Sequence, residues 1–206
     1  MAVATYEQAN YHFPPAYQLG TDGQTWHSWR ILILPYIEQD KLFKAYRFEE
    51  PWNGPNNTQF ADQMPKTFAF SGAHRAGLTT TNYLAVVGTE TMWPGAKSRK
   101  REEIKDGTDK TILIVENNGL GVHWMEPRDL KFATMDFGFD SPNGVSSWYV
   151  SPSVVTADGS VRRLSRKMTP ESLRAALTVA GGEEIADGPD GWTVIPDGRK
   201  RERKEP

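Results

Sequence analysis

The polar residues with the clearest chemical potential follow the apolar run TILIV at residues 111–115. Carboxylate and amide side chains gather there within a short stretch, together with one arginine. The group consists of Glu116, Asn117, Glu126, Arg128 and Asp129. A charge at the end of an apolar strand is either solvated or bound to something, because an unpaired buried charge is costly. Several carboxylates with a neighbouring amide suit a hard cation that prefers oxygen ligands, so calcium is one interpretation.

A structural ion pair is the interpretation that we favour for this group. Arg128 is the nearest basic residue, and a guanidinium can bind a carboxylate through two parallel hydrogen bonds. We therefore predict that Arg128 pairs with Glu116 or Asp129 and that Trp124 packs over the strand. Calcium stays open as the alternative, although the spacing does not resemble an EF-hand loop.

Three tryptophans, Trp93, Trp124 and Trp148, suggest a further kind of chemistry. Their rings could form a surface that binds carbohydrate or a related ligand. Tryptophans exposed around a concave surface would favour such a binding module, whereas tryptophans buried in the core would favour a structural protein.

Familiar catalytic motifs are missing from the sequence. It holds no HExxH, no GxSxG, no phosphate-binding glycine loop and no dinucleotide fingerprint. The four histidines are dispersed, and the adjacent pair His27 and Ser28 would point in different directions on a helix. We predict that His27 is a half-buried helix residue, that no residue is catalytic, and that the protein is not an enzyme.

Residues 25–53 carry the strongest helical pattern and are expected to form the main core helix. The apolar side chains recur at a 3.6-residue period on one face, namely Trp29, Ile33, Tyr36, Ile37 and Phe43. Pro35 removes a backbone donor and disfavours helical dihedrals at Leu34. We therefore expect the helix to kink or break at Pro35.

Extended segments dominate the chain after residue 80. β-branched runs bounded by turn residues favour strands. The expected antiparallel sheet includes residues 83–87, 111–116, 152–157 and 160–164, and one more strand is expected at residues 192–195. Asp158-Gly159 predicts a hairpin with a two-residue turn. Thr169 and Pro170 predict the cap and first position of a helix that ends at Gly181-Gly182.

Composition and charge fit one domain over residues 1–196 with a disordered basic tail at 197–206. The net charge of -2 argues against general nucleic-acid binding, and the absence of cysteine excludes disulfides and thiolate metal sites. The longest aliphatic run, residues 31–34, is far shorter than the ~20 residues that a membrane-spanning helix needs.

Six motifs occur in an order and at a spacing typical of one family. They are FPPAY at 13–17, HSWRILILPYIEQDKLFKAYRFEEPWNGPNN at 27–57, TNYLAVVG at 81–88, EEIKDGTDKTILIVEN at 102–117, WMEPRDL at 124–130 and ADGSVRRLS at 157–165. With these motifs the chain resembles the planctomycete family known as domain of unknown function 1559, whose members look like prepilins of the H-X9-DG type. Two positions depart from the family pattern. Phe70 and Ser71 stand where relatives often carry a cysteine, and Trp148 replaces the histidine ten residues before Asp158.

The resemblance implies a pilin-like α+β fold, in which an N-terminal helical part packs on an antiparallel sheet. It also implies a structural or assembly subunit of the cell envelope, on the periplasmic side or at the cell surface, with other pilin-like subunits as partners. Such a subunit is anchored by an N-terminal apolar helix, so we expect that helix to precede Ala2 in the natural gene. The alternatives are a family member without an anchor and a secreted binding module.

Overall fold

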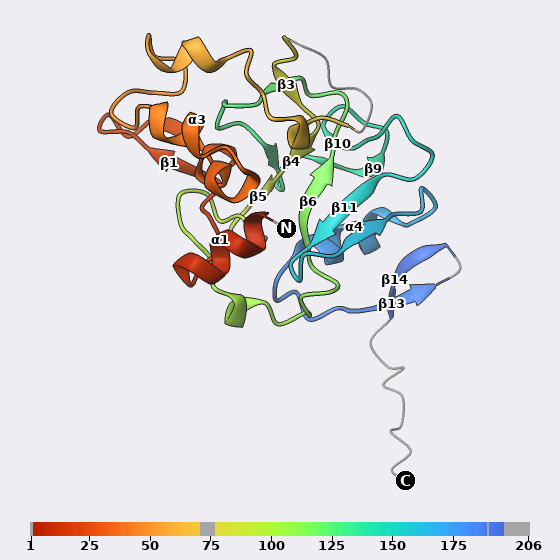
Figure 1. Ribbon diagram of the computed structural model, residues 1–206. Coiled ribbons are helices and arrows are strands. Elements are labelled where there is room, and N and C mark those ends of the chain that lie inside the picture. The colour runs from red at the N-terminus through yellow and green to blue at the C-terminus, as the bar shows by residue number, and fades with distance from the viewer. Residues whose placement is uncertain (1, 71–76, 189, 196–206) are drawn as a thin grey trace.

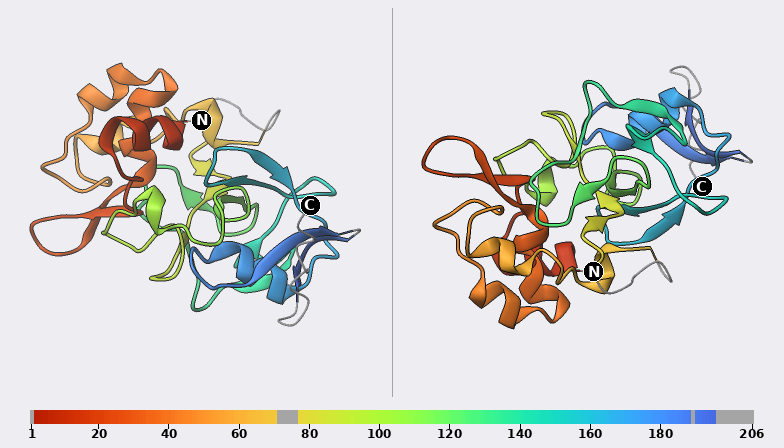
Figure 2. Two further views of the ribbon diagram at one scale, coloured as in Figure 1. Left: turned by 90° about the horizontal axis from the view of Figure 1, so that it is seen from below. Right: turned by 90° about the horizontal axis from the view of Figure 1, so that it is seen from above.

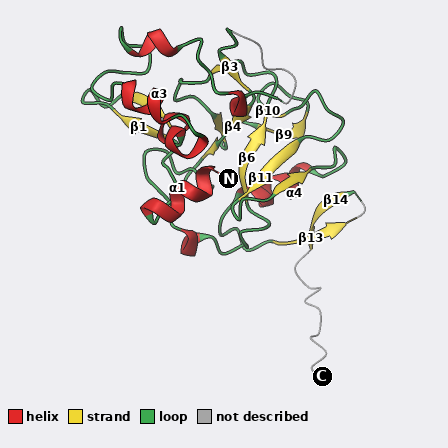
Figure 3. Cartoon of the chain, viewed as in Figure 1, coloured by secondary structure: helices red, strands yellow, loops and turns green. Residues whose placement is uncertain are grey.

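Four antiparallel strands form a central sheet between an N-terminal helical layer and a smaller C-terminal layer (Figures 1 and 2). This computed structural model describes residues 2–70, 77–188 and 190–195. Most of the helical turns precede the sheet strands along the chain. Figure 3 shows the helices in red and the strands in yellow. Helices and strands are thus segregated, and the fold belongs to the α+β class that the sequence predicts.

The N-terminal layer is built from short helical elements between Ala2 and Phe68. They are α1 (Ala2–Asn10), α2 (Trp29–Leu32), η1 (Leu34–Ile37), α3 (Asp40–Ala45), η2 (Asn57–Phe60) and η3 (Lys66–Phe68), where η denotes a 3₁₀ helix. None of the helices within the described residues has the length and apolar character needed to cross a lipid bilayer.

Residues 25–53 do not form one long helix, so that prediction is wrong. The segment starts as strand β2 (Thr25–Ser28), which pairs with β1 (Tyr17–Leu19). Helix α2 begins at Trp29 because the Ser28 hydroxyl caps it, accepting a hydrogen bond from the Arg30 backbone N–H at 3.2 Å. The expected break at Pro35 is confirmed, since α2 ends before it and a separate 3₁₀ helix follows.

The central sheet uses the segments that the sequence predicts, in the order β12-β11-β6-β4. The strands are β4 (Tyr83–Leu84), β6 (Ile112–Glu116), β11 (Ser153–Thr156) and β12 (Val161–Arg163). The expected strand 83–87 is interrupted at Ala85. Beyond it, β5 (Val86–Val87) leaves the sheet and pairs in parallel with β8 (Leu130–Lys131). This pairing places β8, which follows Glu116 in the chain, beside β5.

The two faces of the sheet pack against different layers. Leu84, Val115 and Val154 belong to the core on the side of helix α4 (Pro170–Leu177). Ile114 and Val155 belong to the core shared with the N-terminal layer. Alternate residues of a strand point to opposite faces, which explains this division.

The hairpin at Asp158-Gly159 forms, but its loop has three residues rather than two. The Thr156 N–H donates to the Ser160 carbonyl at 2.9 Å, and the Gly159 N–H donates to the Thr156 carbonyl at 2.9 Å. Gly159 has φ 90°, the left-handed conformation that closes a three-residue loop.

Helix α4 begins as the sequence predicts, with Thr169 as its cap and Pro170 at its first turn. It ends at Leu177, before the expected Gly181-Gly182, because Thr178 adopts an extended conformation. A hairpin of β13 (Glu184–Gly188) and β14 (Gly191–Ile195) completes the C-terminal layer. The predicted strand 192–195 is thereby confirmed.

The remaining elements lie in the long connections. They are β3 (Thr80–Thr81), which pairs with β7 (Val122–His123), the parallel pair of β9 (Asp136–Phe139) and β10 (Gly144–Val145), and η4 (Arg101–Glu103). The predicted disordered tail at 197–206 lies outside the described residues.

Candidate functional site

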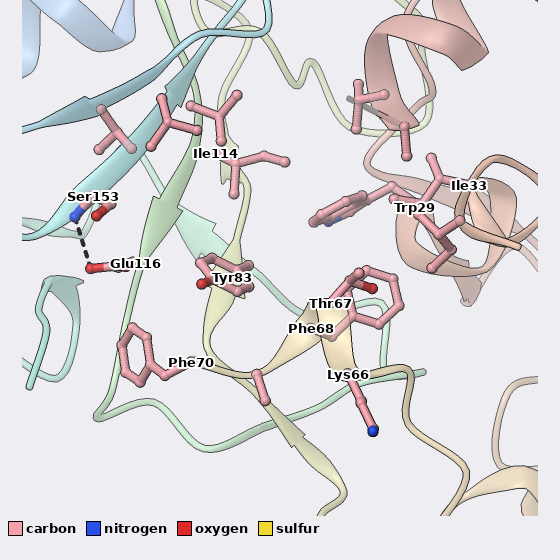
Figure 4. Close-up of a pocket in the computed structure, with 17 residues that line it drawn as sticks. Trp29, Ile33, Lys66, Thr67, Phe68, Phe70, Tyr83, Ile114, Glu116 and Ser153 are labelled. Atoms are coloured by element: carbon pink, nitrogen blue, oxygen red, sulfur yellow. Dashed lines mark hydrogen bonds between the residues drawn. The ribbon is translucent and has the colours of Figure 1, made fainter. Parts of the chain in front are cut away.

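An apolar groove lies between the sheet and the N-terminal layer (Figure 4). We call it the sheet groove, and its volume is about 800 Å³. Its walls come from α1, α2, η1, η3 and the sheet strands, and they are mostly aromatic and aliphatic. Residues that line it include Trp29, Ile33, Phe68, Phe70, Tyr83, Ile114 and Val155. A concave apolar surface with a few polar groups is the usual form of a binding site.

The strand register explains why the sheet presents this face to the groove. Tyr83 on β4 is opposite Glu116 on β6, Ile114 is opposite Val155 on β11, and Val155 is opposite Val161 on β12. Paired residues share a face of the sheet. The N-terminal layer covers only part of this face. Val161, on the edge strand β12 of the sheet, is 69% exposed.

Glu116 is the carboxylate of the sheet groove. It is only 3% exposed, and its Oε2 accepts a hydrogen bond from the Ser153 backbone N–H at 2.8 Å. No basic group lies within ion-pair distance of Glu116 in the part of the chain that the structure describes. Burial, and then the nearby Glu116 and Tyr149, raises the pKa of the Tyr83 hydroxyl above its ordinary value of 10.0.

Aromatic rings gather at the same end of the groove. The Phe70 ring lies 6.1 Å from the Tyr83 ring, 5.1 Å from the Trp148 ring and 5.8 Å from the Tyr149 ring, measured between centroids. Phe70 itself is buried, whereas Trp148 and Tyr149 are 66% and 48% exposed. The sheet groove therefore continues into an exposed aromatic patch.

The predicted pairing of Arg128 with Glu116 or Asp129 is wrong. Arg128 instead binds Glu126 through two hydrogen bonds, from Nε to Oε1 at 2.7 Å and from Nη2 to Oε2 at 3.1 Å. Arg128 and Glu126 are two residues apart in sequence, and they form this ion pair at the surface. Asp129 pairs with Arg30, whose Nη2 lies 2.5 Å from Oδ1.

Arg30 is the residue of this region that sequence reasoning missed. Its side chain is fully buried in α2, and it donates to the Tyr83 carbonyl at 3.0 Å and to the Ser28 hydroxyl at 2.9 Å, besides Asp129. Asp129 also accepts from the Ala85 N–H at 2.8 Å. Burial raises the pKa of Asp129, and the attraction of Arg30 opposes that rise. The pair joins the N-terminal layer to the sheet.

The three tryptophans proposed for ligand binding occupy different environments. Trp93 and Trp124 are buried in the core, and their ring N–H groups donate to the backbone carbonyls of Leu113 at 2.5 Å and Ala61 at 3.0 Å. Trp124 stacks on Phe68 and belongs to the same core cluster as Leu113 and Ile114 of the TILIV strand. Only Trp148 of the three is exposed, so they do not form one surface.

The oxygen ligands considered for calcium also lie apart. The Asn117 side chain donates to the carbonyls of Pro142 and Gly144, while Glu126 and Asp129 are each held by their own arginine. Within the described residues no group of three or more His, Cys, Asp or Glu side chains could hold a metal ion.

His27 is buried and hydrogen-bonded through both ring nitrogens. Nδ1 lies 2.9 Å from the Tyr46 hydroxyl, and Nε2 lies 3.3 Å from the Phe48 carbonyl. Burial lowers the pKa of His27 below 6.5, against the opposing effects of that carbonyl and of Glu49. The Ser28 hydroxyl points to Arg30 instead, so His27 and Ser28 are separate structural residues.

The family comparison matches the part of the chain that forms the N-terminal layer. The model of a family described as "Protein of unknown function (DUF1559)" matches residues 1–74. The match supports assignment of the chain to the DUF1559 family. The matched residues carry α1 to η3 and the Trp29 wall of the sheet groove. Searches of curated proteins and of solved structures found no match.

Proposed function

We propose that this DUF1559 chain is a non-enzymatic cell-envelope subunit that resembles a prepilin or pseudopilin. An apolar helix that precedes α1 in the natural gene anchors it in the membrane, and the three described layers form the part outside the bilayer. Its partners are other pilin-like subunits.

The observation that carries the proposal is the position of α1 beside a partly uncovered sheet face. Ala2 and Val3 line the sheet groove, so any segment joined before Ala2 emerges next to that face. An exposed apolar sheet face is a common site of protein contact. Helix against sheet is also the layer arrangement that the resemblance to prepilins implies.

The upstream gene sequence is the first test. We expect ~20 or more apolar residues directly before this chain, the length that spans a bilayer. A tagged product of the whole gene is then expected in the membrane fraction. A soluble product with no apolar segment before Ala2 would refute the anchored-subunit proposal.

Cross-linking of the same product tests for partner subunits. The chain has no cysteine, so a single introduced cysteine reacts without background. Val161→Cys places a thiol on the uncovered sheet face, and Leu19→Cys is the control because Leu19 is 52% exposed on β1. We expect bismaleimide to cross-link the Val161→Cys protein to a second subunit and to leave the control monomeric. Equal yields for the two variants would count against assembly through this face.

A further inference from the structure

The Glu116 end of the sheet groove holds a buried carboxylate that forms no ion pair with any other residue that the structure describes. Its Oε2 accepts a hydrogen bond from the Ser153 backbone N–H at 2.8 Å, which is a neutral donor and brings no positive charge. A buried charge of this kind is costly unless something pairs with it. Glu116 could therefore pair with a positive group from outside the described residues.

Two basic side chains near the groove are directed elsewhere. Arg166 contacts the segment beside Glu116, but it binds the Asp140 carboxylate and the carbonyls of Ser147 and Tyr149. Lys66 lines the opposite wall, and Figure 4 shows its amine pointing away from Glu116. Neither side chain neutralises the carboxylate.

Aromatic rings complete the environment of Glu116. Tyr83 faces it across the β4–β6 pair, and Figure 4 shows the hydroxyl on the side of the Tyr83 ring toward Glu116. Phe70 packs against the rings of Tyr83, Trp148 and Tyr149. Ring faces attract cations within about 6 Å of their centroids, and most strongly where water is excluded.

We propose that this end of the groove binds an organic cation, an ammonium or guanidinium group carried on an apolar body. Glu116 receives the charge, the rings contact the carbons next to it, and the apolar walls of the groove receive the body. Calcium fits less well, because it takes about 6–8 oxygen ligands and this end offers one carboxylate among rings. The site goes beyond the subunit function and does not depend on it.

Calorimetric titration of the chain tests the ligand class directly. Phenethylammonium is the cationic probe, and 2-phenylethanol is its neutral counterpart of the same length. We expect the ammonium to bind at least about tenfold more tightly, as a charge-assisted hydrogen bond is stronger than a neutral one. A capped lysine amide is the second cation, and its affinity relative to phenethylammonium shows whether a small amine or a basic protein side chain is preferred. Equal binding of charged and neutral probes, or no binding of either cation, would overturn the proposal.

Two variants locate the site. Glu116→Gln removes the charge but keeps an acceptor for the Ser153 N–H, and the matched control is Glu184→Gln at an exposed carboxylate of β13. We expect Glu116→Gln to abolish the preference for the ammonium and Glu184→Gln to leave it unchanged. Trp148→Ala is a second variant for the case that Glu116→Gln does not fold. Because the Trp148 ring is exposed, its removal should leave the fold intact. We expect it to weaken ammonium binding several-fold. Unchanged binding in Trp148→Ala, or an unchanged preference in folded Glu116→Gln, would place the cation elsewhere.

Discussion

At the residue scale, burial separates two arginine–carboxylate pairs that look alike in sequence. The side chains of Arg30 and Asp129 are 0% and 2% exposed, whereas those of Arg128 and Glu126 are 42% and 24% exposed. Removal of one partner from a buried pair strands the other charge, while a surface pair contributes little because water screens it. The mutational costs of the two arginines should therefore differ strongly.

We predict that Arg30→Ala lowers the free energy of unfolding by about 3–5 kcal/mol, because Asp129 loses its counter-ion. The control Arg128→Ala should lower it by about 0–1 kcal/mol. Urea unfolding followed by circular dichroism measures both. Similar losses for the two variants would show that burial of the Arg30–Asp129 pair does not set its contribution apart from that of the surface pair.

His27 makes stability depend on pH. Its pKa is lowered by burial, and burial likewise lowers the pKa of His123. The unfolded chain takes up these protons near pH ~6.5, whereas the folded protein does not, so stability falls as pH drops below about 6.5. We predict that unfolding free energies measured from about pH 7 to about pH 5 fall less steeply in His27→Gln than in the parent chain.

A second substitution controls for the other histidine. His123→Gln should also make the fall shallower, and the double variant should show the smallest change of the three. If the double variant loses stability with falling pH as steeply as the parent, other groups cause the acid sensitivity.

The sequence placed Glu116 at the edge of the core correctly but assigned the wrong partners around it. A carboxylate that ends a β-branched run is visible in the sequence. The partner of Asp129 is not visible in the sequence, because Arg30 lies within an apolar helical pattern and is 99 positions away from Asp129. Contacts of that sequence separation depend on how β5 and β8 pair, which no local pattern reveals.

At the element scale, the local signals worked where one physical preference dominated. Residues 112–116 and 153–156 are strands as predicted, because their β-branched residues fit the pleated surface of a sheet. Residues 25–28 were misassigned to a helix because they directly precede the apolar period that begins at Trp29. Pairing with β1 decided their conformation, and tertiary contacts commonly override such patterns.

The β11–β12 hairpin depends on the left-handed conformation of Gly159. We predict that Gly159→Val lowers the free energy of unfolding by more than about 1 kcal/mol, because a β-branched residue is strained at positive φ. Gly159→Asn is the control and should cost less, since asparagine tolerates this conformation. Thermal and urea unfolding measure both. A melting temperature of Gly159→Val equal to that of the parent would mean that the loop does not need glycine.

At the scale of the whole molecule, the carboxylates considered for calcium are distributed over separate contacts. Glu116 lines the groove, Glu126 is at the surface, and Asp129 is in the core. A ligand raises the melting temperature only if it binds the folded state. We predict that millimolar calcium changes the melting temperature by less than about 1 °C, because no folded site gathers these groups. A rise of several degrees that Glu116→Gln abolishes would favour the calcium interpretation.

The Arg30–Asp129 pair also constrains how the chain can fold during synthesis. The two residues are 99 positions apart, and ribosomes add about 5–20 residues per second, so Arg30 waits for roughly 5–20 s before its partner exists. Until then the guanidinium cannot be buried without a large penalty. The 74 residues that match the family model end before Tyr83 and Asp129. We therefore expect that this matched segment, expressed alone, is not an independent folding unit, and that a nascent chain of that length is a substrate for chaperones.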